Sequence, residues 1–116
     1  MTATILVVDD EENARLFISD FLNQKGYEVK GVANLKDART RVNEGVADII
    51  LLDVQLPDGF GTDLLRETAS MPLRPPIIII TAHADIDMAV EAMKNGAHDF
   101  LQKPIELEQL ERSVQR

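Results

Sequence analysis

Short apolar runs that end abruptly in polar side chains are the feature that most constrains the fold of this 116-residue chain. Runs of four aliphatic residues at 5–8, 49–52 and 77–80, and a shorter run at 100–102, are typical of strands buried on both faces of a parallel sheet. Ligands of such sheets bind beyond the carboxyl ends of the strands. One edge of the sheet is therefore expected to collect the residues that follow the runs: Asp9, Asp10, Asp53, Thr81 and Lys103.

Segments between these runs carry apolar residues at helical spacing. One follows Asp10 and ends at Gly26, with its apolar positions at Ala14, Phe17, Ile18, Phe21 and Leu22. A second begins at Asn34, a good helix cap, and ends at Gly45. Both segments are predicted to be helices.

The rest of the chain continues the alternation. A less buried edge strand is predicted at 28–32, a short helix after the loop at 56–59, and helices at 85–95 and 106–115. The helix at 85–95 is expected to face inward through Ile86, Ala89, Val90 and Met93. Five strand–helix units with right-handed crossovers favour a doubly wound α/β sheet, although periodicity leaves the strand order open.

Composition excludes several classes of protein. Without cysteine the chain has no disulfide framework and no thiolate metal site, so a reducing cytoplasm is expected. A net charge of -8 argues against direct nucleic-acid binding by this domain. No apolar run approaches membrane-spanning length, and no signal peptide is apparent, so no membrane association is expected. The length fits one domain, 1–116. Because the last apolar stripe is still in register at Arg116, a further domain is expected beyond it.

The carboxylates at the strand ends indicate a metal site. Asp9, Asp10 and Asp53 would repel one another, and a hard divalent cation with oxygen ligands, Mg²⁺, relieves that repulsion. With no histidine at these strand ends and no cysteine, zinc and copper do not fit. A plainer interpretation, carboxylates favoured at a helix start, suits Glu11 and Glu12 but does not explain Asp53, which ends another strand.

A carboxylate beside Mg²⁺ can attack phosphorus and form an aspartyl phosphate, and Asp53 is the candidate nucleophile. The ammonium of Lys103 and the hydroxyl of Thr81 suit the charge on a transferring phosphoryl group. Taken singly, a threonine at a strand end is typical of a turn and a lysine before proline is typical of a solvated side chain. The joint arrangement favours phosphoryl chemistry.

Competing motifs are absent from the sequence. There is no G-x-x-x-x-G-K-[ST] loop, and no G-x-G-x-x-G follows the first strand. Asp53 lacks the second aspartate two residues later that aspartate-nucleophile phosphatases typically carry. His83 and His98 are too few and too separated to indicate a metal site, so surface or loop positions are expected for both.

In this order and spacing, segments 5–10, 52–61, 80–82 and 100–104 resemble the receiver domain of two-component response regulators over essentially the whole chain. The resemblance implies a flavodoxin-like (βα)5 fold with a five-stranded parallel sheet of order 2-1-3-4-5. It also implies that a sensor histidine kinase phosphorylates Asp53. Mg²⁺ would then be held by Asp9, Asp10, Asp53 and the backbone carbonyl of Gln55.

The same resemblance assigns the remaining roles. Thr81 would be the switch hydroxyl, Phe100 the switch aromatic and Lys103 the phosphate-contacting ammonium, with a cis bond before Pro104. Phe100 stands where tyrosine is frequent, and a plain core role for it stays open. Segment 81–101 is more narrowly similar to receivers of NtrC-type (sigma-54-dependent) transcription activators, and of some receivers joined to helix-turn-helix domains. This implies an output domain in cis that binds DNA or hydrolyses ATP.

Phosphorylation is expected to draw Thr81 toward the phosphate and to let Phe100 rotate inward. The face made by the fourth helix, fifth strand and fifth helix would change, with homodimerisation or release of the output domain as the readout and transcription as the target. The chain would thus be a signalling switch and not an enzyme, catalysing only its own phosphorylation and dephosphorylation. Two alternatives remain open: a phosphatase on the same fold, and a binding module that works without phosphorylation.

Overall fold

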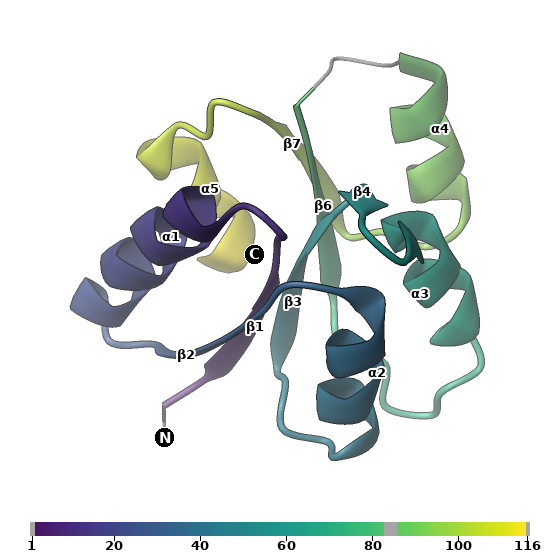
Figure 1. Ribbon diagram of the computed structural model, residues 1–116, viewed down its shortest axis with the longest axis horizontal. Coiled ribbons are helices and arrows are strands. Elements are labelled where there is room, and N and C mark those ends of the chain that lie inside the picture. The colour runs from purple at the N-terminus through teal and green to yellow at the C-terminus, as the bar shows by residue number, and fades with distance from the viewer. Residues whose placement is uncertain (1, 83–85, 116) are drawn as a thin grey trace.

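The computed structural model describes residues 2–82 and 86–115. Its centre is a parallel sheet of five strands in the order β2-β1-β3-β6-β7 (Figure 1). The strands of this sheet are β1 (Thr4–Val8), β2 (Glu28–Val32), β3 (Ile49–Asp53), β6 (Ile77–Thr81) and β7 (Asp99–Gln102). Because β4 and β5 form a separate hairpin, this order is the expected 2-1-3-4-5 arrangement, and the predicted fold is confirmed.

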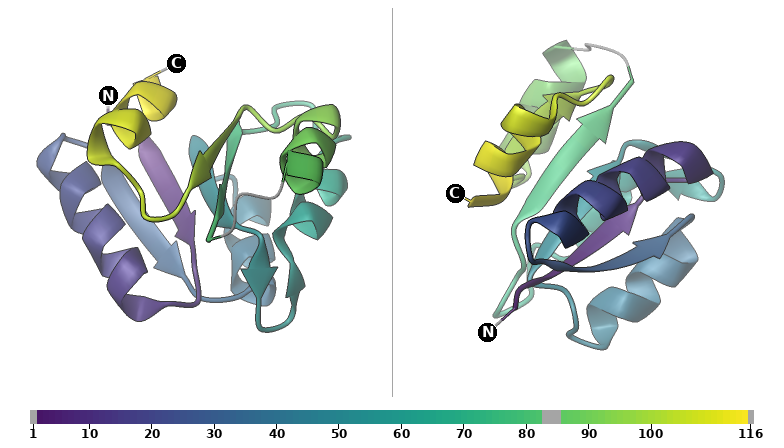
Figure 2. Two further views of the ribbon diagram at one scale, coloured as in Figure 1. Left: turned by 90° about the horizontal axis from the view of Figure 1, so that it is seen from above. Right: turned by 90° about the vertical axis from the view of Figure 1, so that its left-hand side faces the viewer.

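Helices cover both faces of the sheet (Figures 1 and 2). Their bounds are α1 (Glu12–Gln24), α2 (Leu35–Asn43), α3 (Gly61–Glu67), α4 (Ile86–Lys94) and α5 (Leu107–Gln115). Helices α1 and α5 lie on one face, and α2, α3 and α4 lie on the other. No helix in the described part of the chain is long and apolar enough to cross a membrane.

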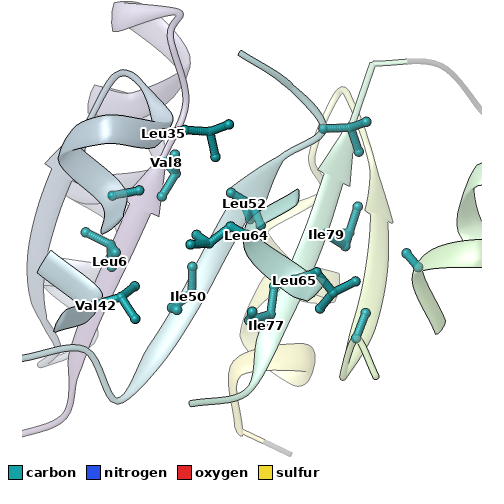
Figure 3. Close-up of a cluster of buried hydrophobic side chains, with 14 of the residues drawn as sticks. Leu6, Val8, Leu35, Val42, Ile50, Leu52, Leu64, Leu65, Ile77 and Ile79 are labelled. Atoms are coloured by element: carbon teal, nitrogen blue, oxygen red, sulfur yellow. The ribbon is translucent and has the colours of Figure 1, made fainter. Parts of the chain in front are cut away.

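The central strands are apolar on both faces because both faces are buried. Successive side chains of a strand point in opposite directions, so the aliphatic runs divide between two clusters. One cluster packs under α2, α3 and α4 and includes Leu6, Leu52 and Ile79 (Figure 3). The other packs under α1 and α5 and includes Leu51 and Ile78. This two-sided burial holds the carboxyl ends of β1, β3 and β6 side by side.

The predicted cap of α2 is confirmed. The side-chain Oδ1 of Asn34 accepts a hydrogen bond of 2.8 Å from the N–H of Asp37, three residues further on. This bond satisfies one of the four N–H groups that a helix start leaves without a partner in the helix.

The loop predicted at 56–59 contains a short hairpin instead. Strand β4 (Gln55–Leu56) pairs antiparallel with β5 (Gly59–Phe60), directly after the end of β3. Strands of two residues are too short to show a period of two, so no sequence pattern predicted them.

The inward face predicted for α4 is wrong at two positions. Val90 and Met93 are 46% and 47% exposed, whereas Ala92 is buried and Met88 packs against the core. The apolar stripe of α4 is wider than the face it buries, so spacing alone could not select the buried side. Other predictions here lie outside the described residues: the positions of His83 and Asp85 and the side chains of Ile86 and Ala89.

Helix α1 also buries only part of its apolar surface. Ile18 and Leu22 are fully buried, while Phe17 is 54% exposed although it shares their helical spacing. His98 is exposed, as predicted.

Candidate functional site

The carboxyl ends of β1 and β3 bring three carboxylates together. Asp9 follows β1, Asp10 comes next, and Asp53 is the last residue of β3. One carboxylate oxygen from each residue lies within 4.8 Å of the others. Asp9 and Asp53 are only 2% and 8% exposed, and Asp10 is exposed. The predicted convergence of these residues is therefore present.

Hydrogen bonds fix Asp9 at the turn between β1 and α1. Its N–H donates to the carbonyl of Val32 at 3.1 Å, and its Oδ1 accepts from the N–H of Glu11 at 2.9 Å. Its carbonyl oxygen accepts from Nη1 of Arg15 at 2.8 Å. The turn thus holds a buried carboxylate at the start of a helix, where negative charge is favoured.

Lys103 joins two of the carboxylates. Its Nζ lies 2.9 Å from Asp9 Oδ2 and 3.0 Å from Asp53 Oδ2. Its backbone N–H donates to the carbonyl of Thr81 at 2.7 Å, which ties it to the end of β6. The peptide bond between Lys103 and Pro104 is cis.

The charges of the site perturb one another. Burial is the main cause that raises the pKa of Asp53, and the charge of Asp9 adds to it, whereas Lys103 opposes the shift. Burial lowers the pKa of Lys103, but its contacts with Asp9 and Asp53 outweigh burial and raise that pKa. Lys103 therefore stays positively charged between the two carboxylates. Of these, Asp53 is buried at a cost, because its charged form is better solvated in water.

The acidic cluster fits a hard divalent cation. Three carboxylates face one ammonium group, so the cluster carries excess negative charge. Asp9 Oδ2 is buried and accepts no hydrogen bond from the described residues. Its contact with Lys103 is an ion pair. Carboxylate oxygens with access to water are the ligands that Mg²⁺ prefers.

A cavity of about 390 Å³ opens over these residues. Asp53 lies in its wall with Thr81 and Lys103, and Gln55 contributes from the hairpin. The N–H of Gln55 donates to Asp53 Oδ1 at 3.2 Å. The cavity is wide enough for a small anionic group, such as a phosphoryl group, to reach the Asp53 carboxylate.

Thr81 and Phe100 differ in their relation to the cavity. Thr81 is buried at the end of β6 and lines it. Phe100 is half-buried in β7, packs against the core cluster under α2, α3 and α4, and is absent from the described lining. It lines a separate cavity of about 320 Å³ between β7 and α5, together with Arg112 and Ser113. Thr81 therefore lies at the cavity, as predicted, whereas Phe100 lies on the adjacent strand, and its role as the switch aromatic stays a prediction.

Sequence reasoning also missed the part that Gly61 plays in shaping the site. Gly61 begins α3 and packs so closely on β3 that a Cβ there would overlap the carbonyl oxygen of Asp53. Its N–H donates to the carbonyl of Val54 at 2.6 Å. The glycine itself was visible in the sequence, but the approach of backbone to backbone was not.

An apolar groove of about 720 Å³ continues from the cavity along α1. Phe17 and Ile18 line it from α1, and Pro104 and Ile105 line it from the segment before α5. Lys103 lines both the groove and the cavity over Asp53, so the two adjoin at this residue.

Comparison with known proteins gives a consistent result. The response regulator receiver domain family matches residues 5–115. The regulatory protein AtoC of Escherichia coli K12 is 37% identical over 112 residues, which are 97% of this chain and 24% of AtoC. The transcriptional regulatory protein FixJ of Rhizobium meliloti is 37% identical over 103 residues, 89% of this chain and 50% of FixJ. The chain thus spans about a quarter to a half of the length of these relatives.

Solved structures agree with the sequence relatives. The beryllofluoride-activated NtrC4 receiver domain dimer has a TM-score of 0.90 at 34% identity, covering 97% of this chain and 93% of that one. The chemotaxis response regulator CheY4 of Vibrio cholerae has a TM-score of 0.91 at 28% identity, covering 100% and 98%. The NtrC4 match agrees with the narrower resemblance to NtrC-type receivers. The chain belongs to the family of two-component response regulator receiver domains.

Proposed function

We propose that this chain is a phosphorylation-controlled switch in which Asp53 accepts a phosphoryl group from a sensor histidine kinase. The observation that carries the proposal is the position of the Asp53 carboxylate. It lies in the wall of a cavity, 3.0 Å from the ammonium of Lys103 and beside two further carboxylates. A nucleophile, a cation and a metal-binding acidic pair are the parts that phosphoryl transfer requires.

In the proposed transfer, an oxygen of Asp53 forms a bond to phosphorus while the bond from phosphorus to the kinase histidine breaks. The electron pair of the broken bond stays with the imidazole nitrogen. Asp9, Asp10, Asp53 and the Gln55 carbonyl would hold Mg²⁺, which supplies positive charge against the phosphoryl oxygens. Lys103 supplies a second positive charge from the protein itself. Beyond this transfer and the hydrolysis of its own phosphate, the chain would act on no substrate.

The kinase would approach Asp53 along the groove beside α1. This groove is lined by apolar side chains, and it shares Lys103 with the cavity over Asp53. Phe17 is 54% exposed and lines the groove, so together with the other apolar lining residues it offers area that a docked kinase would cover.

Thr81 and Phe100 would report the phosphorylation. Thr81 lines the cavity and can donate a hydrogen bond to a phosphoryl oxygen at Asp53. Its movement would vacate space into which Phe100, half-buried on the adjacent strand β7, can turn. A Thr81→Ala variant should therefore still be phosphorylated, but phosphorylation should change its dimerisation less than it changes that of the parent.

The surface that changes would be formed by α4, β7 and α5. Val90 and Met93 already expose apolar area there. The similar NtrC4 receiver is a dimer in its beryllofluoride-activated form. We therefore expect phosphorylation to control a homodimer or an output domain in cis that follows residues 1–116, with transcription as the target. Direct nucleic-acid contact is not expected of this domain, because its net charge is -8.

The decisive experiment is intact-mass measurement after incubation with acetyl phosphate and Mg²⁺. A single phosphoryl adduct is expected, lost on treatment with hydroxylamine and absent from Asp53→Asn or in EDTA. If no adduct forms, a beryllofluoride titration of the same protein follows. Failure to bind beryllofluoride would reject the switch and favour a binding module that works without phosphorylation.

A further inference from the structure

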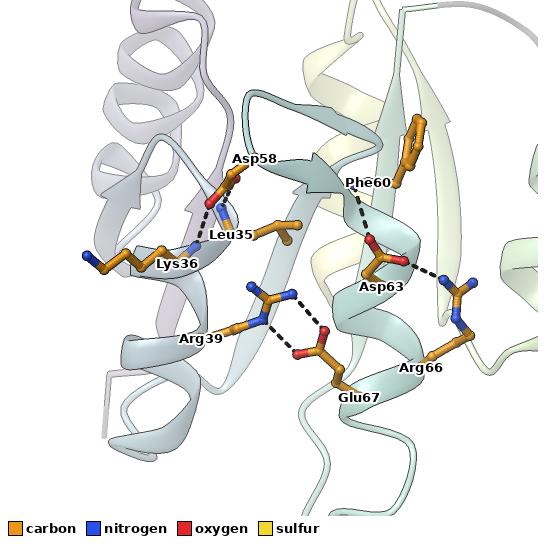
Figure 4. Close-up of polar contacts among 8 residues, drawn as sticks. All are labelled: Leu35, Lys36, Arg39, Asp58, Phe60, Asp63, Arg66 and Glu67. Atoms are coloured by element: carbon orange, nitrogen blue, oxygen red, sulfur yellow. Dashed lines mark hydrogen bonds and ion pairs between the residues drawn. The ribbon is translucent and has the colours of Figure 1, made fainter.

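Asp58 holds the turn of the β4–β5 hairpin against the first residues of α2. Its Oδ1 accepts a hydrogen bond of 2.8 Å from the N–H of Leu35, and its Oδ2 accepts one of 3.0 Å from the N–H of Lys36 (Figure 4). These N–H groups belong to the first two residues of the helix and have no partner within it. Since Asn34 serves only the N–H of Asp37, the start of α2 depends on two side chains, one of them from the hairpin.

A tight apolar contact accompanies these bonds. A Cβ at Gly59 would lie 2.8 Å from Cδ1 of Leu35, which is fully buried in the core. The turn is therefore seated on a helix start that cannot move without disturbing the core. The bond from Leu35 is the main cause that lowers the pKa of Asp58, so this carboxylate is charged at neutral pH.

The other end of the hairpin meets the phosphoryl-transfer site. Gln55 is the first residue of β4, and its N–H donates to Asp53 Oδ1 at 3.2 Å. Gln55 pairs with Phe60 and Leu56 with Gly59, so the two strands are short and have few bonds of their own. A hairpin this small is not stable by itself and takes its position from what it docks against.

Building on the proposed function, we propose that Asp58 is a positioning residue for the metal site. By fixing the turn on α2, it fixes Gln55, whose backbone carbonyl is one of the proposed Mg²⁺ ligands. Without Asp58 the hairpin samples more conformations, and metal binding must order it again at a cost in affinity. By thermodynamic linkage, Mg²⁺ in turn favours the docked hairpin, so the start of α2 is coupled to the site.

A purely structural role for Asp58 makes a different prediction. As a helix cap alone, it would contribute to the free energy of unfolding and leave the Mg²⁺ affinity of the folded protein unchanged. Asn34 offers the matched control, because Asn34→Ala also removes one cap of α2, and the hydrogen bonds described for the Asn34 side chain go to Asp37 and not to the hairpin. Both variants should lose stability, and only Asp58→Ala should bind Mg²⁺ more weakly.

The test is an amide NMR titration of the whole chain with Mg²⁺ alone, at a temperature where each variant is folded. Residues that directly orient metal ligands change affinity by tens of fold, so a residue acting through a turn should weaken Mg²⁺ binding about 3- to 10-fold. Asp58→Asn, which keeps one acceptor oxygen, should lie between the parent and Asp58→Ala. Phosphorylation by acetyl phosphate should be slower in Asp58→Ala at low Mg²⁺ and equal to the parent at saturating Mg²⁺.

The outcomes separate the two proposals. If the parent binds Mg²⁺ and Asp58→Ala binds it equally well, the positioning role is overturned and the switch stands. An equal loss of affinity in Asp58→Ala and Asn34→Ala would also overturn it, because general loosening of α2 would then be the cause. If the parent itself neither binds Mg²⁺ nor forms an adduct, both proposals fail.

Discussion

The ammonium of Lys103 lies 3.0 Å from Asp53 Oδ2, although fifty positions of sequence separate the two residues. The same ammonium is 2.9 Å from Asp9 Oδ2. One cation thus offsets two buried carboxylates. Removing it leaves negative charges that are costly to keep away from water.

We expect Lys103→Ala to lower the free energy of unfolding by about 1–3 kcal/mol in EDTA at neutral pH, because both carboxylates lose their partner. Mg²⁺ should recover part of this loss, because the cluster without the ammonium is more negative, binds the cation more tightly than in the parent, and is stabilised more by it. Urea unfolding with and without Mg²⁺ measures both effects. Lys25→Ala, which breaks an exposed pair with Glu111, is the control and should change stability little. An equal loss for Lys103→Ala in both conditions would contradict the expectation.

Gly61→Ala should damage the site by moving the backbone of Asp53. The added Cβ meets the carbonyl oxygen of Asp53, so either α3 or β3 must shift, at about 1–3 kcal/mol. Gly45→Ala is a control of similar cost, because Gly45 has a φ of +72° but open space around it. Acetyl phosphate labelling should slow only in Gly61→Ala. Equal labelling rates in the two variants would show that Asp53 tolerates the shift.

Arg74 links the carboxyl ends of two helices. Its Nη2 donates to the carbonyls of Leu65 at 2.8 Å and Asn95 at 3.3 Å, and its Nε donates to Thr68 Oγ1 at 3.3 Å. Arg74→Ala should cost about 1–3 kcal/mol, because these acceptors lose their donor. Amide hydrogen exchange should quicken at the end of α4.

The control for Arg74 is Arg66→Ala, which removes an exposed arginine that pairs with Asp63 on the surface of α3 (Figure 4). Its effect on stability should be small. Unchanged exchange in α4 after the loss of Arg74 would mean that this helix is held at its end by other contacts.

The Asp58 carboxylate predicts a specific acid response. The bonds from Leu35 and Lys36 lower its pKa in the fold, so its contribution to stability is present above the ordinary aspartate pKa of 3.8 and is lost as the pH falls through the lower pKa of the folded protein. In Asp58→Asn the free energy of unfolding should therefore fall less steeply as the pH drops below about 5. Urea unfolding across this range checks the slope.

Phe17→Ser should impair transfer from the kinase but not labelling by acetyl phosphate. The small phosphodonor needs only the cavity at Asp53, whereas a protein donor must also cover the groove. Leu16→Ser is a matched control, because Leu16 is 52% exposed on the same helix and lies outside the described groove lining. Slower labelling of Phe17→Ser by both donors would place the effect in the site and not in docking.

Much of the fold could be predicted because its strongest signal is simple. Strands buried on both faces must be apolar at every position, so β1, β3 and β6 stood out as unbroken aliphatic runs. The polar residues after them had to meet, since parallel strands end at the same edge. The convergence of Asp9, Asp53, Thr81 and Lys103 follows from that rule alone.

What the sequence could not predict depends on contacts without a local pattern. Asp58 reaches the N–H of Leu35 from 23 positions away, and no spacing rule connects a turn to a distant helix start. Helix α4 carries more apolar side chains than it buries, so the exposed sides of Val90 and Met93 were decided by packing against its neighbours. The strand order came from the family resemblance and not from periodicity.

The four isoleucines that begin β6 are all buried, and their β-branched side chains have little rotamer freedom. Because β6 is packed tightly on both faces, we expect it to bend little when its Thr81 end is displaced. The main chain at this end of β6 is bonded to the next segment, because the N–H of Lys103 donates to the Thr81 carbonyl at 2.7 Å, so we expect a displacement of Thr81 to be passed to that segment. The centre of the domain is therefore rigid, tightly packed hydrocarbon, and we expect a change at Thr81 to be expressed in the segments at the edge of the sheet and not in the core.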